Sequence, residues 1–164
     1  MLTLESSDHQ QFTIPFSVAK QSITLRNMME DTLMENTSPS TEAVPLTTIK
    51  GNCLQHVIEY MAHCEAHPEE MTRFQKGGKI DAFTPWDTVF AQKMKSDLWI
   101  FFEVMMASNF LEVKSLLELM FRSWAGMMQG KTDAEICQLF NIRTDATPEE
   151  IAAIKAANPW LEDV

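Results

Sequence analysis

The sequence predicts an α/β protein of the α+β kind, with a small sheet near the amino terminus and helices over the rest of the chain. Residues 2–4 and 12–14 alternate apolar and polar side chains on either side of a polar turn, which is typical of a β-hairpin. Apolar side chains recur at helical spacing in residues 52–65, 96–108 and 111–129. The length of 164 residues suits one domain, or one domain with a helical extension.

The first half of the chain mixes short elements with two long connections. Residues 16–30 are expected to form two short helices that are broken near Ser22. Residues 44–46 predict a strand, and the proline inside it restricts that strand to a sheet edge or a very short length. Segments rich in Ser, Thr, Pro, Gly and charge at about 35–43 and 66–83 predict flexible surface loops.

Three later helices have clear start signals. In each, a threonine precedes an acidic residue by three positions, as in a capping box: Thr84 with Asp87, Thr132 with Glu135, and Thr147 with Glu150. Gly130 is expected to end the preceding helix. These signals locate helix starts and say nothing about chemistry.

Charge and cysteine content limit the class of protein. The net charge of -10, with scattered basic residues, makes nucleic acid and membrane surfaces poor partners. The three cysteines have no disulfide-framework spacing, which indicates a reducing compartment. The first residues lack the features of a signal peptide, so we expect a cytoplasmic and nuclear protein.

Apolar side chains are unusually dense in the helical second half. The helix predicted at residues 96–108 is apolar nearly all round, so more than one of its faces must be covered. Methionine and aromatic residues, which are enriched at adaptable interfaces, contribute much of this surplus. The pattern alone leaves two alternatives open, a methionine-rich core and a surface covered by another chain.

Short segments in a fixed order resemble the Skp family (S-phase kinase-associated protein) over essentially the whole chain. They are Ala19-Lys20-Gln21-Ser22, Pro85-Trp86-Asp87 ahead of Phe90, Ala107-Ser108-Asn109-Phe110-Leu111, Lys114 with Leu116-Leu117, Gln129-Gly130-Lys131-Thr132, Phe140-Asn141-Ile142 and Asn158-Pro159-Trp160. No single segment is diagnostic, whereas the ordered set is highly specific.

The resemblance implies a BTB/POZ-like domain over residues 1–128 and carboxyl-terminal F-box-binding helices over 129–164. It implies a non-catalytic adaptor of an SCF-type cullin–RING ubiquitin ligase, which bridges F-box substrate receptors to the cullin. The alternative is a BTB-like module that binds F-box proteins or self-associates, as a weak homodimer, without engaging a cullin.

The resemblance also assigns residues to the two partners by matching position. Asn109 and Phe110 fall in the cullin-facing segment, with Met105 one turn earlier. The expected F-box contacts are Leu117, Phe121, Trp124, Met128, Ile136, Phe140, Ile142 and Trp160. Pro148 is a possible modification site, because the matching proline is hydroxylated and glycosylated in some protist relatives; its first-turn helix position already explains it.

Several departures from the family indicate a diverged paralogue. Phe110 stands where the family usually has tyrosine, and Phe121 and Trp124 are bulkier than the usual residues. Leu161 replaces a typical cysteine, and the usual acidic loop is here the Ser/Thr-rich segment 36–41. The F-box groove and the cullin contact are therefore expected to be altered.

Catalytic and metal-binding signatures are missing from the sequence. It contains no P-loop, GxGxxG, GxSxG or HExxH motif. Cys53, His56, His63, Cys64 and His67 are the only cluster of metal-ligand types, and their spacing does not bring four ligands together. We therefore expect no cofactor and no metal, and hold a zinc-dependent enzyme as a remote alternative.

Overall fold

The computed structural model describes residues 1–34, 43–73, 82–142 and 147–158, without the side chains of 31–34 and 71–73. The chain divides into two compact units, Met1–Met127 and Met128–Val164. Each unit is described by itself below. The assignment of separate partners to the parts before and after residue 128 stays a prediction.

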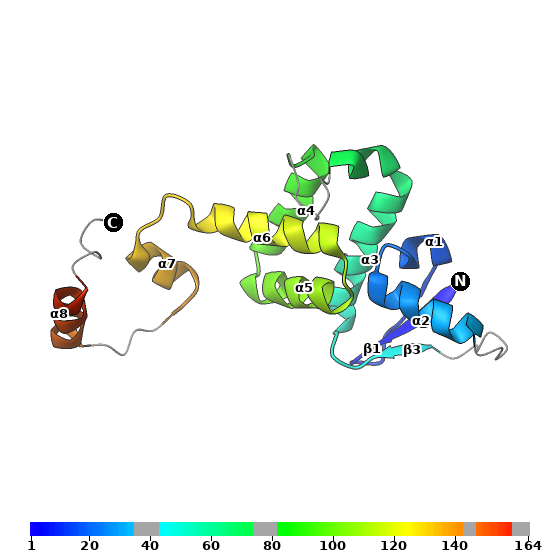
Figure 1. The fold of residues 1–164 in the computed structure, drawn as a ribbon, viewed down its shortest axis with the longest axis horizontal. Helices are drawn as coiled ribbons and strands as arrows, with labels where there is room; N and C mark the ends of the chain where they lie inside the picture. Colours follow the sequence, from blue (N-terminus) through cyan, green and yellow to red (C-terminus); the bar gives the residue numbers. More distant parts are fainter. Residues whose placement is uncertain (35–42, 74–81, 143–146, 159–164) are drawn as a thin grey trace. The chain divides into compact units, whose positions relative to one another are not determined.

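The first unit contains a three-stranded sheet in the order β2-β1-β3, of which Figure 1 labels β1 and β3. Strands β1 (Leu2–Ser6) and β2 (Gln11–Ile14) pair antiparallel, and β3 (Val44–Leu46) pairs parallel with β1. The predicted hairpin and the short edge strand are both confirmed. The proline of β3 lies on the edge strand, where a missing amide hydrogen is tolerated.

Helices cover this sheet and form most of the core of the first unit. They are α1 (Phe16–Ala19), α2 (Ile23–Met34), α3 (Gly51–Ala66), the 3₁₀ helix η1 (Pro68–Arg73), α4 (Pro85–Lys95), α5 (Leu98–Phe110) and α6 (Lys114–Met128). Helix α3 contacts both the sheet and α5. The core runs through these elements and includes fully buried Leu4, Leu54, Phe101 and Leu116. This is the mixed architecture of a BTB/POZ-like fold.

The predicted loop at 66–83 is only partly correct within the described residues. Helix α3 continues to Ala66, and η1 follows directly. The ring of His63 stacks on Trp86 at 3.8 Å between centroids, and its Nε2 atom lies 3.1 Å from the Glu70 carboxylate. The Glu70 contact holds η1 against α3, and the stacked rings hold α3 against α4. The rest of the predicted loop, and most of the one at 35–43, lie outside the described residues.

The last helix of the first unit begins later than predicted, at Lys114 rather than Leu111. Between α5 and α6 the chain makes a Schellman-type turn, in which the Val113 amide donates to the Ser108 carbonyl oxygen at 2.9 Å. Glu112 adopts the left-handed conformation that this turn requires, with φ of 51°. Because no glycine marks this position, the sequence pattern placed the break between the two helices too early.

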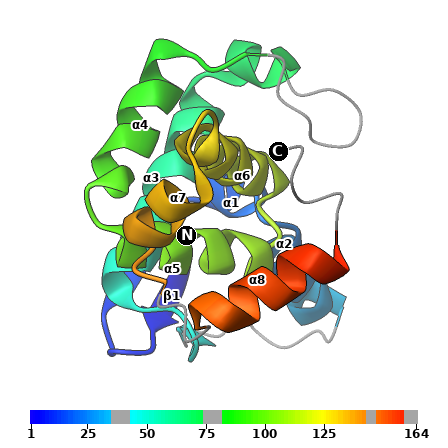
Figure 2. The ribbon, with the colours of Figure 1, turned by 90° about the vertical axis from the view of Figure 1, so that its left-hand side faces the viewer.

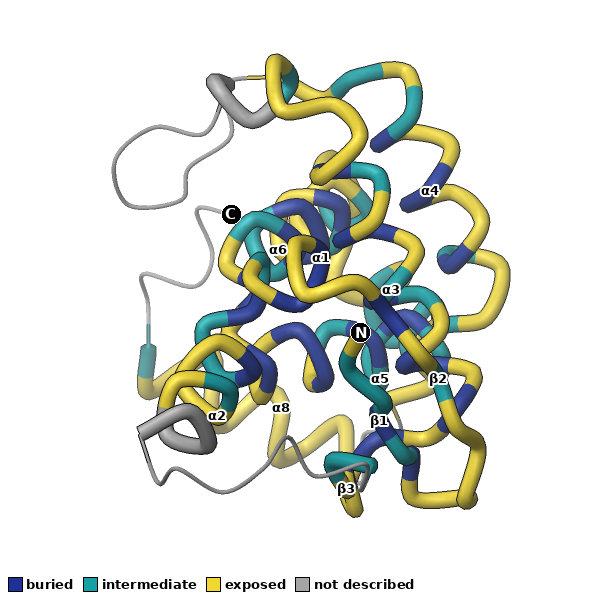
Figure 3. The backbone as a smooth tube through the Cα atoms, turned by 90° about the vertical axis from the view of Figure 1, so that its right-hand side faces the viewer, coloured by how far each residue is buried: buried dark blue, intermediate teal, exposed yellow. Residues whose placement is uncertain are grey.

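The second unit contains α7 (Asp133–Leu139) and α8 (Pro148–Ala157), coloured orange and red in Figure 2. Both helices begin with the predicted threonine capping boxes, and Gly130 has a positive φ of 74° shortly after α6 ends. Neither helix has a buried residue, and α8 is exposed throughout (Figure 3). Within its described residues the second unit therefore lacks a hydrophobic core of its own.

Candidate functional site

A groove of about 540 Å³ opens in the first unit, between α5 and the connection from β3 to α3. We call it the α5 groove, and its lining residues are Ser7, Thr48, Ile49, Lys50, Cys53, Trp99, Phe102, Glu103, Met106, Ala107 and Phe110. Three of its large apolar side chains remain exposed to solvent: Trp99 at 69%, Met106 at 66% and Phe110 at 48%. Exposed apolar side chains gathered in one depression are typical of a protein-docking surface.

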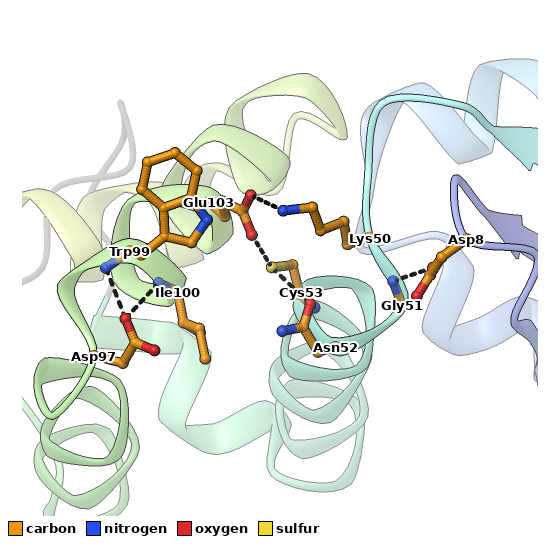
Figure 4. A network of polar contacts seen from close by, with 9 residues as sticks. All are labelled: Asp8, Lys50, Gly51, Asn52, Cys53, Asp97, Trp99, Ile100 and Glu103. Atoms are coloured by element: carbon orange, nitrogen blue, oxygen red, sulfur yellow. Dashed lines mark hydrogen bonds and ion pairs between the residues drawn. The ribbon is translucent and has the colours of Figure 1, made fainter.

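A polar network fixes the floor of the α5 groove (Figure 4). The Lys50 ammonium lies 2.7 Å from one oxygen of the Glu103 carboxylate, and the Cys53 thiol donates to the other oxygen at 3.2 Å. The Lys50 hydrogen bond holds the pKa of Glu103 below its ordinary value, and the same contact raises the pKa of Lys50. The carboxylate is thus held in one orientation by two donors.

Two aspartates hold the backbone on either side of this network (Figure 4). Asp8 accepts a hydrogen bond from the Gly51 amide at 2.7 Å, which fixes the start of α3 next to Lys50. Asp97 caps α5 by accepting from the Trp99 amide at 2.9 Å and from the Ile100 amide at 3.3 Å. One wall of the α5 groove is therefore positioned by a helix cap, and the other by a hydrogen bond between residues 43 positions apart.

The far end of α5 is tied to the start of α2. Ser22 Oγ donates to the carbonyl oxygen of Leu111, and Thr24 Oγ1 donates to that of Phe110 at 3.0 Å. Ser22 also accepts from the Leu25 amide at 3.1 Å, so one hydroxyl serves both elements. These bonds fix the backbone of Phe110 where its ring lines the α5 groove.

The three residues expected to face a cullin have different environments. Phe110 lines the α5 groove, and Asn109 beside it is exposed. Met105 is half-buried and packs against the core of the first unit, whereas its neighbour Met106 projects into the groove. Their role as partner contacts stays a prediction.

Sequence reasoning did not select several groove residues. These residues are Lys50, Trp99, Glu103 and Met106. Their only signal was that the helix predicted at 96–108 is apolar nearly all round, which does not reveal which face is open. The α5 groove depends on how α5 packs against the start of α3, which the sequence pattern does not show.

The expected F-box residues of α6 lie partly on the surface of the first unit. Phe121 is exposed and Leu117 is half-buried. Trp124 is also half-buried, and its ring meets Phe102 of α5 edge to face at 5.9 Å between centroids. Helices α5 and α6 lie side by side in Figure 1, and Trp124 helps to hold them together. Phe121 is thus the most accessible of the three.

The expected F-box residues of the second unit are all at least partly accessible. Met128, Ile136 and Phe140 are half-buried, and Ile142 is exposed. On α8, Ile151 and Ile154 are exposed as well, although they were not selected from the sequence. Trp160 and Leu161 lie outside the described residues. Pro148 is exposed at the first turn of α8, in keeping with its capping-box position.

The histidines and cysteines of the candidate metal cluster take part in separate contacts. Cys53 bonds to Glu103 in the α5 groove, and burial raises its pKa to about 12. His63 stacks between Trp86 and His67, at 3.8 Å and 4.3 Å between ring centroids. Among the described residues, no group of three or more His, Cys, Asp or Glu side chains is placed to hold a metal ion. Nor is any helix there long and apolar enough to cross a membrane.

The three-stranded sheet and its helices place the first unit in the BTB/POZ-like class. Two family models match the chain. The Skp1 family tetramerisation domain matches residues 1–66, and the Skp1 family dimerisation domain matches residues 114–161. Together they cover the start of the first unit, helix α6 and nearly all of the second unit.

Curated relatives align over nearly the whole chain. A Dictyostelium discoideum protein named SCF ubiquitin ligase complex protein SKP1a is 37% identical over 164 residues, with 99% of this chain and 96% of the relative covered. An E3 ubiquitin ligase complex SCF subunit of Arthroderma otae is 36% identical, with coverage of 99% and 94%. One of Talaromyces stipitatus is 35% identical, with coverage of 99% and 97%. The chain belongs to the Skp1 family.

Proposed function

We propose that this protein is an adaptor subunit of an SCF-type ubiquitin ligase, which bridges F-box substrate receptors to a cullin scaffold. The observation that carries this proposal is the alignment, over nearly the full length, with relatives named as SCF subunits. Such a chain works without catalytic residues or a cofactor of its own, in the cytoplasm and the nucleus.

The α5 groove is the proposed cullin-docking surface. Phe110, which the family resemblance assigns to the cullin-facing segment, lines this groove together with exposed Trp99 and Met106. Covering side chains of this kind removes apolar surface from water. The free energy gained is about 25 cal/mol per Å² of surface buried. Phe110 has no hydroxyl, so the contact proposed here is more apolar than one made by tyrosine.

Exposed side chains of α6 and of the second unit are the proposed F-box contacts. Phe121 is open on α6, and the two described helices that follow expose apolar side chains without burying any residue. Two short helices without a buried side chain gain little from their own packing, since most helix stability in proteins comes from an apolar face that is covered. An F-box partner would supply that cover.

The mechanism of such an adaptor is proximity. Holding a substrate receptor and a cullin on one chain raises the effective concentration of the substrate near the ubiquitin-loaded enzyme. The Lys50–Glu103 contact and the Ser22 bond to Leu111 support this role, because they hold the walls of the α5 groove in place.

A second candidate function is self-association without a cullin. It is favoured by the match of residues 114–161 to a family model described as a dimerisation domain. In that case the exposed apolar side chains of α6 would meet a second copy of the chain rather than an F-box protein.

Affinity capture with substituted chains tests the proposed function. The full chain should recover both F-box proteins and a cullin, and Phe110→Ala should lose the cullin while it keeps the F-box proteins. Phe121→Ala should show the reverse selectivity. Recovery of F-box proteins with no cullin by the unsubstituted chain would contradict the bridging role. Recovery of a second copy of the chain, with neither F-box proteins nor a cullin, would support the second candidate.

A further inference from the structure

We propose that Trp99 and the Lys50–Glu103 pair determine which partner the α5 groove accepts. The preferred partner is a helix that brings apolar side chains to Trp99, Met106 and Phe110 and an uncharged residue over the ion pair. This inference rests on the proposed function, because it takes that partner to be a helix of the cullin.

Four side chains of α5 that line the groove form a row along one face of the helix. Trp99, Glu103, Met106 and Phe110 follow one another at intervals of four, three and four residues, the spacing of a single helical face. At 1.5 Å per residue this row is about 16 Å long, which corresponds to about three turns of a helix lying along it. A row of this length and spacing fits a helix better than an extended strand.

The ion pair makes the floor of the α5 groove suitable for burial. One Glu103 oxygen is 2.7 Å from Lys50 and the other accepts from Cys53 at 3.2 Å, so both are already bonded. Partly exposed as they are now, at 54% for the Lys50 side chain and 25% for that of Glu103, two such charges contribute little to stability. When a partner covers them, the two charges keep each other as partners. A further charge on the incoming helix would lose its water and find no countercharge, because the pair beside it is neutral overall.

Trp99 connects the apolar row to this pair. The Lys50 ammonium lies 5.8 Å from the centroid of the Trp99 ring, close enough for a cation–π contact that strengthens when water is removed. Tryptophan is also among the residues that dominate binding energy when they become buried at an interface. Trp99 is therefore placed to pack against an apolar side chain of the partner and, at the same time, to shield the ion pair from water.

The occupant favoured by these observations is a cullin helix rather than a second copy of this chain. The row ends at Phe110, so it continues the segment assigned to the cullin. Each chain carries a net charge of -10, so two copies repel one another. Self-association through the α5 groove is the outcome that would oppose the inference.

The first test measures the affinity of the full chain, in complex with an F-box protein, for the amino-terminal domain of a cullin by calorimetry. Trp99→Ala should weaken binding at least about tenfold, which corresponds to 1.4 kcal/mol. Val89→Ala is the matched control, because Val89 is equally exposed at 69% but lies on α4 outside the groove. The control should stay within about twofold of the unsubstituted chain. Equal affinities for Trp99→Ala and the unsubstituted chain would overturn the inference.

The second test separates the charge pair from a merely structural role. Glu103→Gln leaves Lys50 without a countercharge under the partner, so binding should weaken about tenfold. The double substitution Lys50→Met/Glu103→Gln removes both charges and should restore affinity to within about threefold. A double variant as weak as Glu103→Gln alone would overturn the role of the pair, and thermal unfolding of each variant verifies that it is folded.

Phe110→Ala distinguishes failure of this inference from failure of the proposed function. If the unsubstituted chain does not bind the cullin domain, the proposed function itself is wrong. If it binds, and Phe110→Ala weakens binding while Trp99→Ala does not, only the present inference fails. Light scattering on the same samples would reveal a Trp99-dependent dimer, which would also overturn it.

Discussion

Ser22 Oγ donates a hydrogen bond to the carbonyl oxygen of Leu111, and this bond ties the start of α2 to the end of α5. The two residues are 89 positions apart in the sequence, and both are fully buried. The same hydroxyl caps α2 through the Leu25 amide. One small side chain thus connects the amino-terminal helices to the helix that forms a wall of the α5 groove.

Replacing Ser22 should lower the free energy of unfolding strongly for so small a side chain. Ser22→Ala leaves the Leu111 carbonyl buried without its donor and removes the cap of α2, so we expect the free energy of unfolding to fall by about 2 kcal/mol. Denaturant unfolding measures this change. Ser96→Ala is the control, because the exposed Ser96 hydroxyl bonds only to the Lys93 carbonyl within its own turn. Similar losses in both variants would contradict the structural role of Ser22.

The turn between α5 and α6 should tolerate glycine better than its natural residue. Glu112 has a φ of 51°, a conformation that costs little for glycine and more for residues with a β-carbon. We expect Glu112→Gly to raise the free energy of unfolding by about 1 kcal/mol. Glu112→Ala, which keeps the β-carbon and removes the charge, should give no such gain. A gain in Glu112→Ala alone would assign the effect to charge rather than to backbone conformation.

The cysteines should differ in their reaction with an alkylating reagent. Cys53 is buried, and its burial together with the bond to Glu103 raises its pKa to about 12, so the thiol stays protonated at pH 8. Cys64 is buried as well, whereas Cys137 on α7 is partly exposed. Iodoacetamide at pH 8 should therefore modify Cys137 first, as peptide mass spectrometry would show. Faster labelling of Cys53 in the native protein would contradict its placement in the floor of the α5 groove.

Helix α8 should be ordered by a partner rather than by the chain itself. It has ten residues and no buried side chain, and isolated helices of that length are marginal in water. We expect its amide hydrogens to exchange rapidly in the free protein and to become protected when an F-box protein binds. Amides of α3, which lies in the core, provide the protected reference. Strong protection of α8 in the free chain would show that it needs no partner.

Local sequence patterns predicted the elements whose causes are local. Alternation identified the hairpin, and the threonine capping boxes located the starts of α4, α7 and α8 correctly. The break between the two helices was predicted two to three residues too early, because the left-handed conformation of Glu112 has no glycine signal. Local signals therefore sufficed for elements whose conformation is determined by residues close together in the sequence.

The α5 groove could not be predicted in the same way because its parts are distant in the sequence. Lys50 and Glu103 are 53 positions apart, and only the packing of α3 on α5 brings them together. Helix α5 is apolar nearly all round, so no periodicity distinguished the half-buried Met105 from the exposed Met106. The resemblance to a family pointed to the end of the helix at Asn109 and Phe110, and the structure added the other side chains of the helix that line the groove.

The measurement that tests the adaptor role most directly is reconstitution of a three-component complex. Purified chain, an F-box protein and the amino-terminal domain of a cullin are combined and examined by size-exclusion chromatography with light scattering. We predict one complex with a single copy of each component, and no association of the other two when this chain is omitted. If the F-box protein and the cullin domain elute separately in its presence, the bridging function is contradicted.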